Sequence, residues 1–263
     1  MNVQISEGLR IDDAFAARLV DHMLKHLSDS ADRLRDNMGK HDYRSSLGNP
    51  KGQRRIYNRL IRSQHSGLLA ARLDTGTRMR FSMALDLWDA TPAGDDAKGP
   101  LAWLVGSRQE FHSLGPNRLE TQFQEMIALS RHALERLVQR GAARTPEDFI
   151  QIMRRAWVVL SLALCCLDRL PKDGTAWVVP VALANGSVVL LPIVRHTGKG
   201  PLLMVPTALT NDMGIDETAL HPLLDLLAEY EAKGEMNKLP EDPRLPEAFA
   251  ATVRATRKGR RQA

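Results

Sequence analysis

The segment at 145–170 combines a helix start signal with a long apolar run. It opens with the letters TPED at 145–148, which offer a hydroxyl at the N-cap, a proline in the first turn and an acid at the third helical position. Its second half is apolar almost all round, yet the run at 157–167, broken by Ser161, is shorter than the roughly 18–20 residues that cross a bilayer. The segment therefore predicts a helix, ended by Pro171, that is buried in a core.

Other segments repeat apolar residues at three- and four-residue steps, which indicates amphipathic helices. Glycine follows two of them, at Gly141 and Gly234, where a left-handed helix cap favours this residue type. The predicted helices cover residues 12–38, 53–73, 118–140 and 220–233.

Two regions instead show the features of strands. Residues 77–88 alternate between apolar and more polar positions, as a half-buried strand does. In the region 176–210, Asn185-Gly186 separates two apolar runs, which predicts a hairpin, and a third apolar piece follows. Each of the three pieces contains a proline, so we expect these strands to be short, bulged or at an edge.

These elements predict an α+β protein, with a mainly helical body packed with a small antiparallel β-sheet. The sheet is expected to contain the strand 77–88 and the hairpin and third strand of 176–210. We expect one compact domain at 1–235, with a possible sub-boundary near 90–100. A Pro-containing linker and a mobile basic C-terminal tail are expected at 236–263.

Composition excludes several classes of protein. With 43% hydrophobic and 25% charged residues, the chain is neither disordered nor fibrous in type. The first residues, MNVQISEGLRIDDAF, lack the basic region and apolar core of a secretory signal. Cys165 and Cys166 are adjacent and provide no disulfide framework. We therefore expect a cytoplasmic protein that does not associate with membranes.

The formal net charge of +5 conceals two opposed blocks. Residues 32–80 contain twelve basic and four acidic side chains, a net charge of +8, whereas residues 210–250 have a net charge of −7. Ten of the twelve basic residues are arginine, whose planar guanidinium binds phosphate or carboxylate through two hydrogen bonds at once. The basic block is the first candidate for a binding surface.

Within that block, the letters QRRIYNRLIR form a basic amphipathic helix in which Arg55, Arg59 and Arg62 share one stripe. Phosphate binding needs several cations on one surface, and Tyr57 or Trp88 could stack on an unpaired base. We therefore predict a nucleic-acid-associated protein, binding RNA or DNA, that works as a subunit of a ribonucleoprotein or DNA-processing assembly. The predicted nucleic-acid-binding residues are Lys51, Arg54, Arg55, Tyr57, Arg59, Arg62, Arg78 and Arg80.

The basic helix could also be an ordinary solvated face without a binding role. Two other functional hypotheses remain open for it. In the first, the protein is an interaction or assembly subunit, and the basic block 32–80 meets the acidic block 210–250 of the same chain or of a second copy. In the second, it is a metal-independent ribonuclease, in which Arg59 and His65 act with His41 or His112 as cation, acid and base.

The sequence gives little reason to expect a metal or a cofactor. His22 and His26 share a helical face with Asp29, but HMLKH lacks the glutamate of HExxH and a third ligand is not evident. The letters HTGKG at 196–200 lack the upstream glycine of a phosphate loop and the hydroxyl residue that follows its lysine. We interpret the histidines as surface residues of a helix and HTGKG as a turn.

Overall fold

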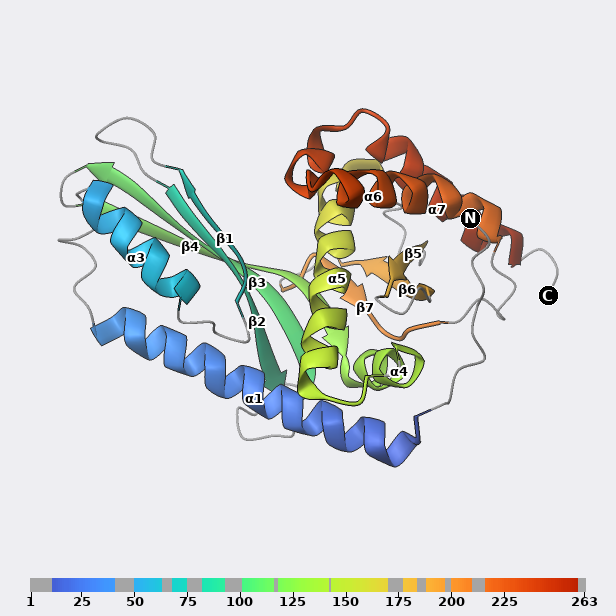
Figure 1. Ribbon diagram of the computed structural model, residues 1–263, viewed down its shortest axis with the longest axis horizontal. Coiled ribbons are helices and arrows are strands. Elements are labelled where there is room, and N and C mark those ends of the chain that lie inside the picture. The colour runs from blue at the N-terminus through green and yellow to red at the C-terminus, as the bar shows by residue number, and fades with distance from the viewer. Residues whose placement is uncertain are drawn as a thin grey trace. The chain divides into compact units, whose positions relative to one another are not determined.

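The computed structural model describes residues 11–40, 50–62, 68–74, 82–92, 101–115, 118–141, 143–169, 177–183, 188–196, 200–209 and 216–259 (Figure 1). Its helices are α1 (Asp13–Lys40), α3 (Pro50–Arg62), α4 (Arg131–Gly141), α5 (Pro146–Cys165), α6 (His221–Lys233) and α7 (Leu245–Gly259). Short 3-10 turns lie at η1 (Leu167–Arg169), η3 (Glu217–Ala219) and η4 (Met236–Glu241). The strands are β1 (Leu68–Asp74), β2 (Ser82–Pro92), β3 (Leu101–Gly115), β4 (Arg118–Ser130), β5 (Trp177–Ala182), β6 (Val188–Arg195) and β7 (Leu203–Val205).

The sheet corrects the expected fold class. Seven strands are hydrogen-bonded in the order β1-β2-β3-β4-β7-β6-β5. The expectation of a mainly helical body with a small antiparallel sheet, formed by 77–88 and 176–210 alone, is therefore wrong. Three strands account for the difference, because β1, β3 and β4 add the ranges 68–74, 101–115 and 118–130 to the sheet.

The two segments predicted as helix but folded as strand have an ambiguous pattern. Leu119, Phe123 and Ile127 recur every four residues, a step that keeps them on one face of a helix and also on one face of a strand. The predicted helix at 53–73 ends at Arg62 instead, and Leu68–Asp74 pairs with β2. Long-range pairing decides both segments, because local propensity is a weak preference that tertiary contacts override.

The chain separates into two compact units. The first unit contains Met1–Val20 and Leu129–Ala263, and the second contains Asp21–Ala128. These boundaries are defined by contacts and do not test whether residues 1–235 fold as one domain, which stays a prediction.

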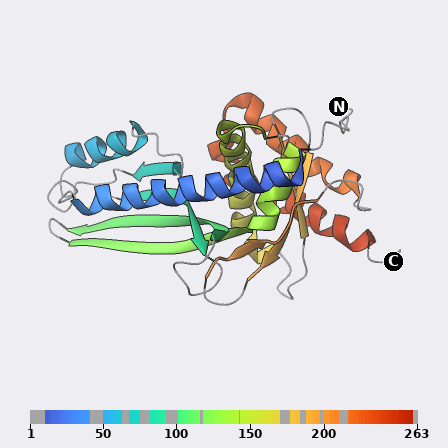
Figure 2. The same ribbon diagram turned by 90° about the horizontal axis from the view of Figure 1, so that it is seen from below.

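In the unit Asp21–Ala128, strand β2 lies between β1 and β3 and is antiparallel to both. Residues 82–88 form a strand as predicted, and Met83, Leu85 and Leu87 are buried on one face of β2. Asp86 and Trp88 on the other face are buried as well, so the expected half-buried alternation is wrong for this part of 77–88. Residues 77–81 lie outside the described residues. The part of α1 in this unit buries an apolar stripe of Met23, Leu24, Leu27, Ala31 and Leu34. Helix α3 lies beside the edge strand β1, as Figure 2 also shows.

In the other unit, α5 begins as its sequence predicts. The Thr145 hydroxyl accepts a hydrogen bond from the Asp148 backbone, and the Asp148 carboxylate accepts one from the Thr145 backbone, so the capping box is complete. Strands β5 and β6 form the expected antiparallel hairpin, although Asn185-Gly186 lies outside the described residues. Helix α6 ends at Lys233 and is capped by Gly234, whose φ of 66° is the left-handed conformation expected there.

The C-terminal region up to residue 259 differs from the Pro-containing linker and basic tail expected at 236–263. Residues Met236–Glu241 form η4, and Leu245–Gly259 form α7, which packs against β5 and α6. Leu239, Leu245 and Phe249 are fully or almost fully buried. The sequence pattern PEAFAATV holds apolar residues at helical spacing, and their burial outweighs the prolines that suggested a linker.

None of the described helices is both long enough and apolar enough to cross a bilayer.

Candidate nucleic-acid interface

Helix α3 presents the predicted basic surface. Its thirteen residues, PKGQRRIYNRLIR, contain five basic side chains and no acidic one. A helix turns by about 100° per residue, so its basic positions fall within an arc of roughly 140°. The structure describes four of these side chains, and all four are exposed: Lys51, Arg54, Arg55 and Arg59. Pro50 opens the helix, a position where its fixed φ and missing N–H cost nothing.

Tyr57 lies on the other side of α3 and fixes the helix to the sheet. Its hydroxyl donates a hydrogen bond of 3.1 Å to the carbonyl oxygen of Ala71 in β1. Because β1 is an edge strand, Ala71 can use this carbonyl without losing a partner strand. The contact gives Tyr57 a structural role as an anchor, and half-burial of its side chain leaves less of the ring for the base stacking that the sequence suggested.

The remaining predicted residues are placed as follows. Arg62 ends α3, but its side chain lies outside the described residues, as do Arg78 and Arg80 altogether. Trp88, the alternative stacking residue, is 1% exposed in β2 and is unavailable to a base. Arg72, which the sequence did not single out, is exposed on β1, the strand that α3 contacts.

A second polar cluster lies on β2 and β3 of the same unit. Arg108 donates two hydrogen bonds to the carboxylate of Asp86, at 2.7 and 3.0 Å, across the pairing of the two strands. Asp86 is buried, and this bidentate contact compensates its charge. Glu110 follows Arg108 by two positions on β3, and its Oε2 lies 3.1 Å from Nε2 of His112 on the same strand.

A pocket of about 450 Å³ adjoins this cluster. It is lined by Arg108 and Glu110 of β3 and by Gln122, Phe123 and Gln124 of β4. Sequence analysis missed these residues, because it predicted 118–140 as a helix and so separated Phe123 from β3. The signal that could have found the pocket is the sequence QFQ at 122–124, an aromatic residue between two polar ones on a segment that also alternates.

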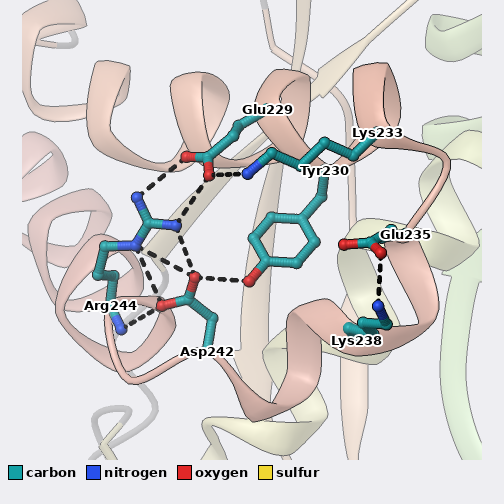
Figure 3. A network of polar contacts seen from close by, with 7 residues as sticks. All are labelled: Glu229, Tyr230, Lys233, Glu235, Lys238, Asp242 and Arg244. Atoms are coloured by element: carbon teal, nitrogen blue, oxygen red, sulfur yellow. Dashed lines mark hydrogen bonds and ion pairs between the residues drawn. The ribbon is translucent and has the colours of Figure 1, made fainter.

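The acidic block 210–250 is engaged within its own unit (Figure 3). The guanidinium of Arg244 bonds both carboxylate oxygens of Asp242 and, at 3.0 and 3.2 Å, both of Glu229. Lys233 also reaches Glu229, at 2.6 Å, and the hydroxyl of Tyr230 donates to Asp242 at 2.8 Å. The network joins α6 to the turn that precedes α7.

Two more carboxylates of the block have cationic partners. Glu235 contacts Lys238 at 2.5 Å, and Glu231 lies 3.5 Å from Arg155 of α5. Lys233, Lys238 and Arg244 belong to the block and are already counted in its net charge of −7, whereas Arg155 adds one positive charge from outside it. The net acidic charge that the assembly hypothesis requires is therefore little changed by these contacts.

The same contacts shift the acid–base properties of the network. The hydrogen bonds from Arg244, followed by that from Lys233, lower the pKa of Glu229 to about 2. The bonds from the Arg244 side chain and backbone hold the pKa of Asp242 well below its usual range. The hydrogen bond to Asp242 raises the pKa of Tyr230 above its ordinary value. Both carboxylates are therefore ionised at neutral pH.

The histidine candidates do not form a metal site in the described residues. The rings of His22 and His26 stack with centroids 6.4 Å apart, and no group of three or more metal-ligating side chains gathers anywhere in the described ranges. Of the ribonuclease candidates, Arg59 lies on α3 and His112 on β3, whereas His41 and His65 lie outside the described residues. The ribonuclease hypothesis stays a prediction.

Comparison with models of protein families, with curated proteins and with solved structures finds no match to this chain.

Proposed function

We propose that this chain is a cytoplasmic, nucleic-acid-associated protein that binds the backbone phosphates of RNA or DNA through α3, as a subunit of a ribonucleoprotein or DNA-processing assembly. The observation that carries the proposal is the exposure of Lys51, Arg54, Arg55 and Arg59 on one face of a helix without an acidic residue. The free thiols of Cys165 and Cys166 are consistent with a reducing compartment.

The geometry of α3 suits a polyanion better than a single anion. The span from Lys51 to Arg59 is about 12 Å along the helix axis, at about 1.5 Å per residue. Nucleic acids present charges at a few ångströms along each strand, so several phosphates face such a span at once. Arginine adds planar, bidentate bonds to phosphate oxygens. The Tyr57 bond to Ala71 fixes the helix, so binding does not have to order it.

The test is binding of the full chain to labelled single-stranded RNA, single-stranded DNA and duplex DNA over a series of salt concentrations. Four phosphate contacts predict a slope of log K against log salt of about −3 for a single strand. In the variant Arg55→Gln/Arg59→Gln we expect this slope to become shallower by about 1.4, because two contacts are lost. Tighter binding to RNA would favour a subunit of a ribonucleoprotein, and tighter binding to DNA would favour a subunit of a DNA-processing assembly.

The matched control is Arg18→Gln/Arg154→Gln, which removes the same charge from two exposed positions on α1 and α5. It should bind with the slope of the wild type. Absence of binding by the wild type at low salt would overturn the proposal, and so would equal loss in the control and in the α3 variant.

A further inference from the structure

The pocket on β3 and β4 joins an exposed aromatic ring to groups that form hydrogen bonds. Phe123 is 59% exposed, the highest value among the large hydrophobic side chains of the described residues. It lies between the exposed Gln122 and Gln124, and the pocket continues to Arg108 and Glu110. Exposing so much apolar ring to water costs free energy, which contact with a ligand would recover.

The charges of the pocket indicate which kind of ligand it takes. Arg108 is bonded twice to the buried Asp86, so its charge is compensated in place. The carboxylate of Glu110 contributes negative charge, and one of its oxygens contacts His112. A phosphate would meet this carboxylate and is disfavoured, whereas a neutral group with N–H donors is favoured. A purely apolar ligand is equally unsuited, because four of the five lining side chains are polar.

A planar, uncharged ring with polar edges satisfies each of these conditions. We propose that the pocket receives an unpaired nucleobase, whose face stacks on Phe123 and one of whose N–H groups donates to Glu110. Stacking on an aromatic residue combined with hydrogen bonds to the edge of the base is how proteins recognise single strands. A volume of about 450 Å³ lies within the range of small-ligand pockets.

This inference rests on the proposed function and specifies its substrate as a single strand. Both α3 and the pocket belong to the unit Asp21–Ala128, so one unit supplies cations for phosphates and a separate, nearly neutral site for a base. The two contributions respond differently to salt, because stacking does not release counterions. They can therefore be measured separately.

The experiment compares a short single strand with an abasic strand of the same length and charge, using the full chain. We expect the wild type to bind the strand with bases on the order of tenfold more tightly, the value that stacking of one base supplies. Phe123→Leu keeps an apolar side chain but removes the ring, and it should abolish this preference without changing the salt slope. Phe123→Tyr keeps the ring and should preserve the preference.

The outcomes distinguish the two proposals. If both strands bind equally to the wild type, or if Phe123→Leu keeps the preference, the pocket does not take a base, although phosphate binding by α3 stands. If neither strand binds, the proposed function fails and this inference fails with it. Photocrosslinking with a strand containing 4-thiouridine should label the peptide around Phe123; labelling confined to other peptides would also overturn the inference.

Discussion

At the scale of single residues, Arg244 connects two acidic side chains of the C-terminal region. Its guanidinium holds two carboxylates, of Glu229 and Asp242, which would otherwise repel each other (Figure 3). Asp242 is buried, so loss of its cationic partner would leave a charge with little solvent around it. The residue therefore stabilises the junction between α6 and α7.

This arrangement predicts a dependence of stability on pH. Because the pKa values of Glu229 and Asp242 are lower in the folded state, the unfolded chain binds more protons than the folded one once the pH falls below about 5. The stabilisation is complete above about pH 6, declines through pH 4 and is progressively lost toward pH 2 and below. We expect Arg244→Gln to lower the midpoint of thermal unfolding by about 2–4 °C at neutral pH. The difference from the wild type should shrink as the pH decreases.

The measurement is thermal unfolding followed by circular dichroism from neutral pH down to acid pH. Arg154→Gln removes the same charge from an exposed position of α5 and should follow the wild-type curve at every pH. A difference between Arg244→Gln and the wild type that stays constant as the pH falls would contradict the proposed stabilisation.

At the scale of elements, the switch from β4 to α4 occurs at Ser130. Its hydroxyl accepts a hydrogen bond from the backbone N–H of Ala133 at 3.0 Å, which caps the helix that begins at Arg131. The same hydroxyl donates to the carbonyl oxygen of Pro206 at 2.6 Å, just after β7. One side chain therefore ends the strand, starts the helix and attaches the junction to a distant segment.

Ser130→Ala removes both bonds at once. We expect the free energy of unfolding to fall by about 0.5–2 kcal/mol, the usual cost of losing an N-cap. Ser130→Thr keeps the hydroxyl and should lose less. Urea denaturation of the three proteins provides the comparison, and an unchanged midpoint for Ser130→Ala would show that the hydroxyl does not determine the switch.

Elements that depend on local spacing could be predicted from the sequence, and those that depend on pairing with a distant strand could not. The capping box of α5 depends on residues three positions apart, so the sequence alone was sufficient to place it. Leu119, Phe123 and Ile127 fit a helix and a strand equally, and pairing with β3 decides between them. The basic face of α3 follows from local spacing, whereas the pocket requires two strands to come together and was missed for that reason.

At the scale of the whole molecule, the C-terminal region belongs to a core and is not an appendage to it. Phe249 of α7 is fully buried, and α7 packs against β5, whose Trp177, Val178 and Val179 are also buried. The unit therefore draws on both the hairpin and the last helix for its apolar interior. The basic composition at the end of the chain concealed this, because the apolar positions of α7 lie between charged ones.

Phe249→Ala tests this role of α7 directly. Truncating a fully buried phenylalanine removes its transfer free energy and leaves a cavity, which costs about 3–5 kcal/mol. Glu247→Gln, at an exposed position of the same helix, should change stability by less than about 1 kcal/mol. Both are measured by urea denaturation with circular dichroism as the signal. If Phe249→Ala were as stable as Glu247→Gln, α7 would contribute no core, and the sequence-based expectation of a tail would regain support. A loss of about 3–5 kcal/mol instead shows that the last helix contributes to the apolar core of its unit.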